Sequence, residues 1–210
     1  MQIGTVITAL RCGEEGERLG EFAGRLAGLL SADVRQPVNT DLDDNVDTLL
    51  ITNEPTHRDR AHVLMLFRED GLSAADGQCV MIPFGSRDSG IDAAELGIPF
   101  AKALGLPMVF YHTTWHEDGR ESEDPRSHMC AGALDVQGTL TGMAHDVGVE
   151  FRFVTQTADD VYEGIVLVAM VERASLIVTS RGSSVRSGSY SDRLHSGPTP
   201  LLIVAKRVVS

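Results

Sequence analysis

Two short apolar runs near the end of the chain constrain its fold more than any other feature. Leu176–Val178 and Leu201–Val204 contain no polar residue. Unbroken apolar runs of this length are typical of strands that are buried on both faces of a parallel sheet. Such sheets belong to α/β folds, which place ligands where a loop leaves a strand and enters a helix. The segment between the two runs is therefore the first candidate for a binding site.

This connecting segment is built mainly from Ser, Arg and Gly. Gly182, Gly188 and Ser189 have small side chains or none, so their backbone N–H groups can cradle a phosphate. Arg181 and Arg186 add positive charge beside them. The same composition is equally typical of a solvent-exposed loop that binds nothing. On composition and spacing alone, both interpretations stay open.

Apolar runs alternate with helical apolar faces through the second part of the chain. The runs predict strands at 79–83, 107–112, 149–154, 175–179 and 201–205. The faces predict helices at 91–104 and 129–147, and a third helix that is capped by Thr157 ahead of Asp159 and Asp160. This β-α-β order predicts a doubly wound parallel sheet.

The first 70 residues show a shorter version of the same pattern. Strands are expected at 5–10, 33–38, 48–52 and 62–67, and a helix with an acidic first turn is expected at 14–30. The polar, Gly-containing segment 68–78 is the expected boundary between the units 1–70 and 79–210.

The two units also align weakly with each other. Laying 6–34 over 80–108 without gaps brings many apolar positions into register. The run at 48–52 resembles 175–179, and 62–67 then corresponds to the final strand. The first unit would be a shortened copy of the second, although any two βα units share this periodicity by chance.

Net charge and cysteine content narrow the partners and the compartment. The net charge of −12 argues against nucleic acid and anionic membrane surfaces as partners. The three cysteines are far apart and odd in number, which favours free thiols in a reducing cytosol. No apolar run is long enough to span a membrane, and the start of the chain lacks the features of a signal peptide. We therefore expect a cytoplasmic protein.

Several motifs of 79–210 occur in an order that one protein family shares. They are a strand followed by G-S, a helix ending in A-K-A-L-G-L-P, the strand M-V-F-Y-H, a helix ending in M-A-H-D-V-G-V-E-F, and A-S-L-I-V-T-S-R-G followed by G-S and P-T-P-L-L-I-V. In this order they resemble the universal stress protein family. Residues 1–70 resemble a truncated, degenerate copy, so the whole chain is similar to a tandem universal stress protein.

The resemblance implies a five-stranded parallel sheet of the adenine nucleotide alpha hydrolase type, preceded by a truncated α/β half-copy. It implies pairing through the last strand, either inside the chain as a pseudo-dimer or between two chains as a homodimer. It also implies a cytoplasmic role in stress response, often with ATP, AMP or another adenine nucleotide bound, and with Mg accompanying ATP.

The family's nucleotide-binding pattern, G-x2-G-x9-G-[S/T], is matched only in part. Thr179 stands at the first Gly and Gly182 at the second, and the closing pair 188–189 follows after only five residues. Phe84 replaces the Asp expected to hold the adenine or ribose, and Thr113 replaces the Val that usually meets the base. The binding residues that the resemblance implies are Pro83, Gly85, Thr113, Thr179, Arg181, Gly182, Ser183, Gly188 and Ser189.

We expect a non-enzymatic stress-response protein that binds an adenine nucleotide weakly and has a signalling or interaction role. One alternative is a structural or interaction module that has lost nucleotide binding, which the shortened loop and Phe84 favour. The other is an ATP-pyrophosphatase-like enzyme that uses the Gly85–Ser89 turn, although this turn more simply caps the next helix.

No metal site is expected from the sequence. His112, His116, His128 and Cys130 lie among acidic residues, but their spacing matches no common ligand motif, and a solvated loop explains them better. Cys79 falls on a buried strand, where a thiol is inert.

Overall fold

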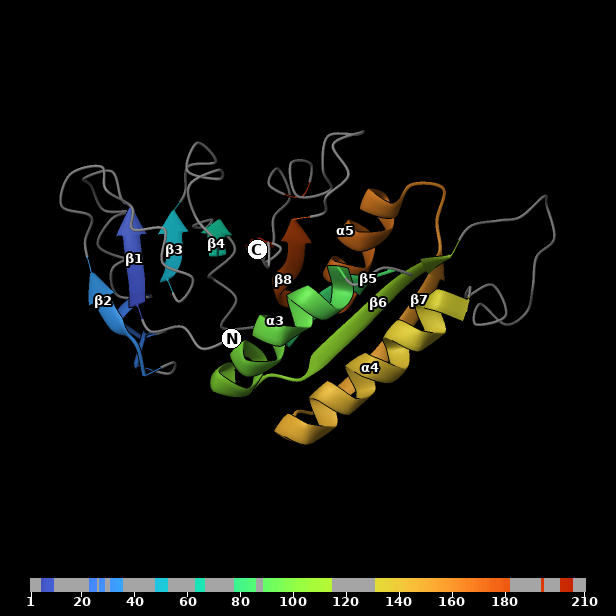
Figure 1. Ribbon diagram of the computed structural model, residues 1–210. Coiled ribbons are helices and arrows are strands. Elements are labelled where there is room, and N and C mark those ends of the chain that lie inside the picture. The colour runs from blue at the N-terminus through green and yellow to red at the C-terminus, as the bar shows by residue number, and fades with distance from the viewer. Residues whose placement is uncertain are drawn as a thin grey trace, which may run out of the picture.

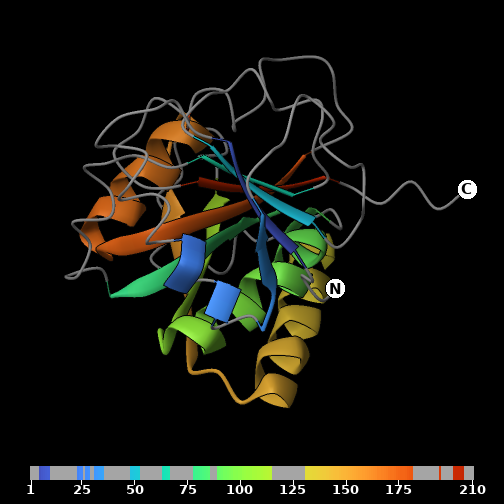
Figure 2. The same cartoon turned by 90° about the vertical axis from the view of Figure 1, so that its left-hand side faces the viewer.

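The chain forms one large sheet with helices on its faces (Figure 1, Figure 2). The computed structural model describes residues 5–9, 23–25, 27–28, 31–35, 48–52, 63–66, 78–85, 89–114, 131–181, 194 and 201–205. The sheet has nine strands in the order β2-β1-β3-β4-β9-β8-β5-β6-β7. Within the described ranges, no helix is both long and apolar enough to cross a bilayer.

The second part of the chain supplies five neighbouring strands and three helices. Its elements are β5 (Cys79–Phe84), α3 (Ser89–Leu104), β6 (Met108–Thr114), α4 (Ala131–Val147), β7 (Phe151–Thr157), α5 (Val161–Val171), β8 (Ala174–Arg181) and β9 (Leu201–Ala205). The strands lie in the order β9-β8-β5-β6-β7, and every neighbouring pair is parallel. The prediction of a doubly wound, five-stranded parallel sheet is confirmed.

The first part of the chain continues this sheet. Its strands are β1 (Thr5–Ala9), β2 (Asp33–Arg35), β3 (Thr48–Thr52) and β4 (Val63–Leu66), and they are mutually parallel. The strand expected at 33–38 ends at Arg35, two residues before Pro37, which has no N–H group to give to a ladder. Residues 23–25 and 27–28 are helical, and the rest of the helix expected at 14–30 lies outside the described residues.

The two parts of the chain meet where β4 and β9 pair. This pairing is antiparallel, with Val63 opposite Val204 and Leu66 opposite Leu201. On its other side β9 pairs with β8. The last strand therefore pairs within the chain, and β9 has no open edge to offer a second chain.

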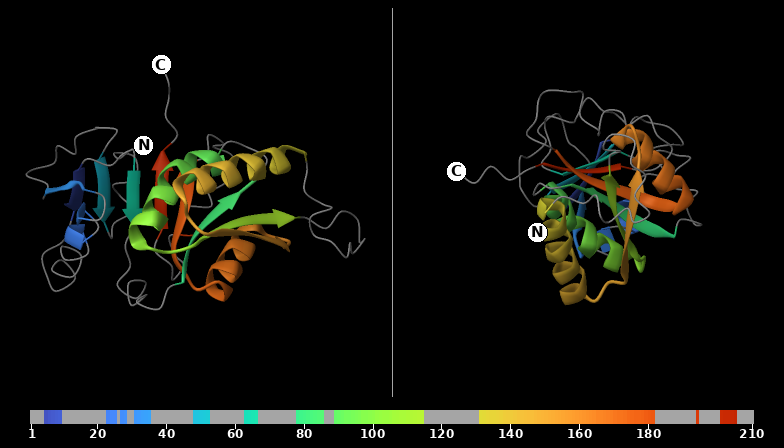
Figure 3. Two further views of the ribbon diagram at one scale, coloured as in Figure 1. Left: turned by 90° about the horizontal axis from the view of Figure 1, so that it is seen from below. Right: turned by 90° about the vertical axis from the view of Figure 1, so that its right-hand side faces the viewer.

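Alternating residues of the strands build two hydrophobic layers. Val80, Ile82 and Phe84 of β5 belong to a cluster that α3 and α4 cover, which we call the α3/α4 face. Cys79 and Met81 belong to a cluster that α5 covers, which we call the α5 face. Figure 3 shows these helices on opposite sides of the sheet. All seven residues of β6, which lies between β5 and β7, are buried.

The start of α5 corrects one prediction. Thr157 is the last residue of β7, and its hydroxyl lies 3.0 Å from that of Thr114 on β6. The residue that caps α5 is Asp160, whose carboxylate accepts the N–H of Tyr162 at 2.8 Å. Thr157 does not cap the helix because it pairs with Thr114 in the sheet. Because β6 extends to Thr114, Thr157 remains in the sheet, and the cap falls on Asp160.

Candidate functional site

The carboxyl ends of β5, β6 and β8 meet at the point where the strand order reverses. β5 lies between β6 and β8, and α3 and α5, which lead into β6 and β8, lie on opposite faces. In α/β sheets of this kind, ligands bind beyond the carboxyl ends of the strands at such a reversal. Gly85 follows β5 there, and a Cβ added to it would meet no atom within 4 Å. The position beside the end of β5 is therefore open.

At this end, β6 extends beyond β5. The last β5–β6 pair is Phe84 with His112, whereas the β6–β7 ladder continues to Thr114 and Thr157. The carbonyl of Thr114 points toward β7, because it accepts the N–H of Ala158 at 3.2 Å. Backbone groups alternate in direction along a strand, so the Thr113 carbonyl points toward β5. It lies past the last paired residue of β5 and has no strand partner among the described residues.

Three of the predicted binding residues project from one face of the sheet. Pro83 follows Met81, Thr113 follows Tyr111 and Thr179 follows Ile177, each by two residues, and those three apolar residues lie on the α5 face. Side chains alternate along a strand, so Pro83, Thr113 and Thr179 lie on this face as well. Met81 is level with Ile177 in the β5–β8 ladder. The fold therefore brings these residues together on neighbouring strands.

Two hydroxyl groups near the end of β8 are buried without a partner. Within the part of the chain that the structure describes, the Oγ1 of Thr179 and the Oγ of Ser180 make no hydrogen bond, and the Oγ of Ser175 at the other end of β8 makes none either. An unsatisfied buried hydroxyl costs about 1–3 kcal/mol. Thr179 lies at the sheet reversal, so a ligand there could supply the missing partner.

The environment of Tyr111 is hydroxyl-rich but neutral. The hydroxyl of Thr113 donates to the Tyr111 oxygen at 3.1 Å. Burial raises the pKa of Tyr111, although the bond from Thr113 lowers it in part. Tyr111 therefore stays protonated at neutral pH. Gly164 of α5 packs against its oxygen, and no side chain would fit between them.

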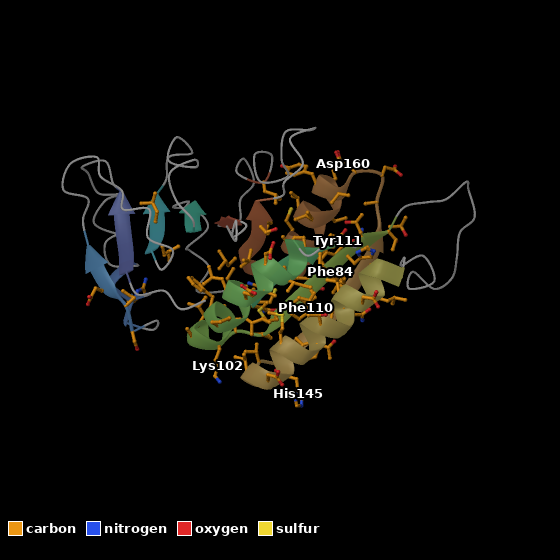
Figure 4. The ribbon with its side chains drawn as sticks, in the orientation of Figure 1. Phe84, Lys102, Phe110, Tyr111, His145 and Asp160 are labelled. Carbon is orange, nitrogen blue, oxygen red and sulfur yellow. The ribbon has the colours of Figure 1, made fainter. Side chains whose placement is uncertain are left out.

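Phe84 occupies the position where the resemblance implies an Asp. Its ring is on the α3/α4 face, 7% exposed, and its centre lies 5.8 Å from that of Phe153. Gly90 of α3 sits directly over it, since a Cβ on Gly90 would lie 2.5 Å from that of Phe84. Figure 4 shows Phe84 and Phe110 between α3 and α4. Phe84 thus supplies no acceptor for a ligand, but it leaves the α5 face free.

His112 is a polar residue of this region whose placement on the strand predicted at 107–112 is confirmed, whereas its grouping with a solvated loop is wrong. It belongs to β6 and is buried, not part of a solvated loop. Its Nδ1 lies 3.0 Å from the Phe84 carbonyl, so Nδ1 carries the proton and donates it. Its position at the end of a predicted strand was the signal that could have found it. His116, His128 and Cys130 lie outside the described residues, among which no group of three His, Cys, Asp or Glu could hold a metal.

The remaining predicted site residues are only partly described. Arg181 is the last residue of β8, and its backbone is level with Ala205 of β9. The predicted phosphate-binding residues Gly182, Ser183, Gly188 and Ser189 lie outside the described residues. Asp160, the N-cap of α5, is labelled beside that helix in Figure 4, and its carboxylate accepts the N–H of Tyr162.

The Cys79 thiol lies at the opposite end of β5 from this region. It is 2% exposed, and its Sγ lies 3.4 Å from the Glu172 carbonyl. Burial raises the pKa of Cys79 to about 11, and the charge of Arg152 offsets part of this rise. The thiolate is the reactive form of cysteine. The predicted burial of this thiol is confirmed, and its lack of reactivity stays a prediction.

Comparison with known proteins supports the fold. No family model and no curated protein matches the sequence. Among solved structures, a universal stress protein from Archaeoglobus fulgidus DSM 4304 is similar with a TM-score of 0.58 and 14% identity, over 96% of this chain and 86% of that one. A universal stress protein in complex with cAMP is similar with a TM-score of 0.52 and 17% identity, over 60% of this chain and 96% of that one. The chain has the fold of the universal stress proteins, as the resemblance implied.

Proposed function

We propose that this chain is a universal-stress-type protein that binds an adenine nucleotide at the carboxyl ends of β5, β6 and β8. The observation that carries the proposal is the buried, unpartnered hydroxyl of Thr179, which shares one face of the sheet with Thr113 and Pro83. A polar group that is buried without a partner usually marks a missing water, ion or ligand. The cAMP bound to a protein of the same fold supports an adenine nucleotide as this ligand.

Each described group has a role that follows from its chemistry. The carbonyl of Thr113, which has no strand partner among the described residues, would accept the exocyclic amino group of adenine. The Thr179 hydroxyl would bond to the ribose or to the first phosphate, and the open position at Gly85 leaves room for the sugar. Gly182, Ser183 and the pair 188–189 would bind phosphate, with Mg when the nucleotide is ATP.

The proposed affinity is weak, and the proposed role is binding rather than catalysis. Phe84 offers no carboxylate to the ribose or base. The described strand ends present carbonyl and hydroxyl groups, and Tyr111 stays neutral because burial raises its pKa. Such groups bind a nucleotide without transferring protons at neutral pH. A signalling or interaction role, in the cytoplasm, follows as the proposal.

A second candidate is an interaction module that binds no nucleotide. The observation that favours it is Phe84, which replaces the expected carboxylate and is locked in the core beneath Gly90. In that case the Thr179 hydroxyl would be satisfied by water.

Calorimetric titration with AMP, cAMP and Mg-ATP distinguishes the two candidates. Thr179→Val removes the hydroxyl while keeping the shape of the side chain, and we expect it to weaken nucleotide binding about tenfold, as loss of one hydrogen bond to a ligand does. Ser175→Ala is the matched control, because it removes another unpartnered hydroxyl from the far end of β8. It should leave binding unchanged. No binding of any of the three at millimolar concentration would leave the interaction module as the function.

A further inference from the structure

The sheet has one long edge that the described residues leave unpaired. Its outermost strands are β2 and β7. β2 has three residues, whereas β7 has seven. An edge strand of this length presents a row of backbone donors and acceptors to which another chain can pair.

Four residues of β7 point their backbone groups outward. The Glu150 carbonyl accepts the N–H of Met108 at 2.8 Å, and the N–H of Ala158 donates to Thr114, so the even-numbered positions of β7 face β6. Backbone direction alternates along a strand. The outward positions are therefore Phe151, Phe153, Thr155 and Thr157.

β7 lacks the features that usually protect an edge strand. It contains no Pro, Gly or Lys, and its sequence is F-R-F-V-T-Q-T. Proteins commonly protect edges with prolines, charges or bulges. The one charged residue, Arg152, is already paired with Glu172. In a chain with a net charge of −12, this edge carries no acidic residue.

One side of α4 faces toward this edge. Ala133, Leu140 and Ala144 of α4 are buried against the sheet, in the cluster to which Phe151 and Phe153 of β7 add. The α3 side of α4 is marked by Val136, which would lie 3.7 Å from a Cβ on Gly90, and by Val147, whose carbonyl accepts from Lys102 at 2.7 Å. Since α3 packs on β5, β8 and β9, the opposite side of α4 faces β7.

The residues on that opposite side of α4 are exposed, and none of them is acidic. It consists of Leu134, Gly138, Thr141 and His145, which follow one another by four, three and four residues and so form one stripe along the helix. We call these four residues the α4 stripe. Leu134 is 50% exposed, and a Cβ on Gly138 would meet no atom within 4 Å. A second helix could approach closely at Gly138.

We propose that two copies of this chain pair along β7, antiparallel, about a twofold axis at Val154. In this register Phe151 lies opposite Thr157 and Phe153 opposite Thr155, so all four outward-facing residues meet outward-facing residues of the second copy. Arg152 lies opposite Gln156, and Val154 lies opposite its own copy. No like charges meet, and aromatic side chains face β-branched ones, which favours antiparallel pairing.

The same axis brings the two α4 helices together. α4 has 17 residues and β7 has seven, so at about 1.5 and 3.3 Å per residue both are about 25 Å long. The centre of the α4 stripe therefore lies near the level of Val154. With strands about 4.8 Å apart, helices that lie between β6 and β7 in each copy would be about 10 Å apart. Packed helices are typically separated by 8–10 Å, and Gly138 makes room for this contact.

Analytical ultracentrifugation of the full chain tests the proposal. We expect the wild-type chain to be a dimer at micromolar concentration. Gly138→Glu should raise the dissociation constant of the dimer at least tenfold. Thr139→Glu is the matched control, because Thr139 is exposed on α4 outside the stripe, and it should remain dimeric. Gly138 has open space for a side chain, and glycine is a poor helix former, so the melting temperature of Gly138→Glu should not fall.

Disulfide trapping tests the register independently. In a background with Cys12→Ser and Cys130→Ser, Val154→Cys places two thiols directly opposite each other, within the Cα separation of about 4.4–6.8 Å that disulfides need. We expect oxidation to give a covalent dimer. In Gln156→Cys the two thiols would be four residues apart along the strands, about 13 Å, so it should not cross-link. A monomeric wild-type chain, or a dimer that Gly138→Glu does not weaken and Val154→Cys does not trap, would overturn the proposal.

Discussion

The Nδ1–H of His112 donates to the carbonyl of Phe84, and the rings of the two residues lie 5.2 Å apart. One side chain thus joins the carboxyl ends of β5 and β6 by a hydrogen bond and by ring contact, next to the proposed nucleotide site.

Replacing His112 should therefore destabilise the fold. His112→Leu removes the donor and leaves the buried end of β5 with fewer partners, so we expect the free energy of unfolding to fall by about 1–3 kcal/mol. Urea denaturation measures this change. Asp146→Asn is the control, since the Asp146 side chain is 85% exposed and lies outside the α4 stripe. Equal stability of both variants would mean that the His112–Phe84 contact contributes nothing.

Gly164 should tolerate no side chain. An added Cβ would collide with the Tyr111 oxygen, so Gly164→Ala should cost about 1–3 kcal/mol despite the better helix propensity of alanine. Adding Tyr111→Phe removes the colliding oxygen and should restore most of this loss. Gly142→Ala, at an open position of α4 outside the α4 stripe, should instead stabilise the fold by up to about 1 kcal/mol. Thermal melts of the four proteins check this order, and a destabilised Gly142→Ala would contradict it.

Asp160 should matter more than its neighbour. Asp160→Ala removes the acceptor of the Tyr162 N–H at the start of α5, and we expect a loss of about 1 kcal/mol. Asp160→Asn keeps an acceptor and should lose less. Asp159→Ala, at an exposed position, is the control and should be near neutral. A larger loss for Asp159→Ala in chemical denaturation would show that the cap is assigned to the wrong residue.

Stability should decline at alkaline pH. Burial raises the pKa of Cys79 from 9.0 to about 11, so the unfolded chain releases this proton first as the pH rises. The contribution of the protonated Cys79 thiol to the free energy of unfolding is complete below about pH 9. It falls by about 2–3 kcal/mol as the pH rises from about 9 to 11. The raised pKa of Tyr111 acts in the same direction. Urea denaturation at about pH 8 and pH 10.5 measures the loss, and Cys79→Ala should reduce it. A pH dependence that is identical in Cys79→Ala would rule out this cause.

The strands could be predicted from the sequence because their apolar runs are short and unbroken. Leu176–Val178 and Leu201–Val204 lie in the neighbouring strands β8 and β9. The run at 62–67, which the alignment of the two units matched to the final strand, contains β4, and β4 lies beside β9. Local patterns determine such elements, since burial on both faces leaves few residue choices.

The candidate site could be predicted less well, because it depends on where strands end relative to one another. Thr113 becomes available only since β6 continues past β5, and Thr157 lost its capping role for the same reason. The position of His112 depends on the carbonyl of Phe84, a residue distant in sequence. Ladder length and long-range contacts of this kind leave no local signal in the sequence. The phosphate-binding segment stays a prediction, since it lies outside the described residues.

The β4–β9 pairing lies within one polypeptide, so dilution cannot separate its two strands. A partner that is tethered in this way is present at a fixed effective concentration, whatever the amount of protein in the cell. Pairing between separate chains, in contrast, responds to expression level. In the nine-stranded sheet, the β4–β9 pairing is therefore independent of protein concentration. The proposed pairing along β7 would instead increase as the concentration of the protein rises.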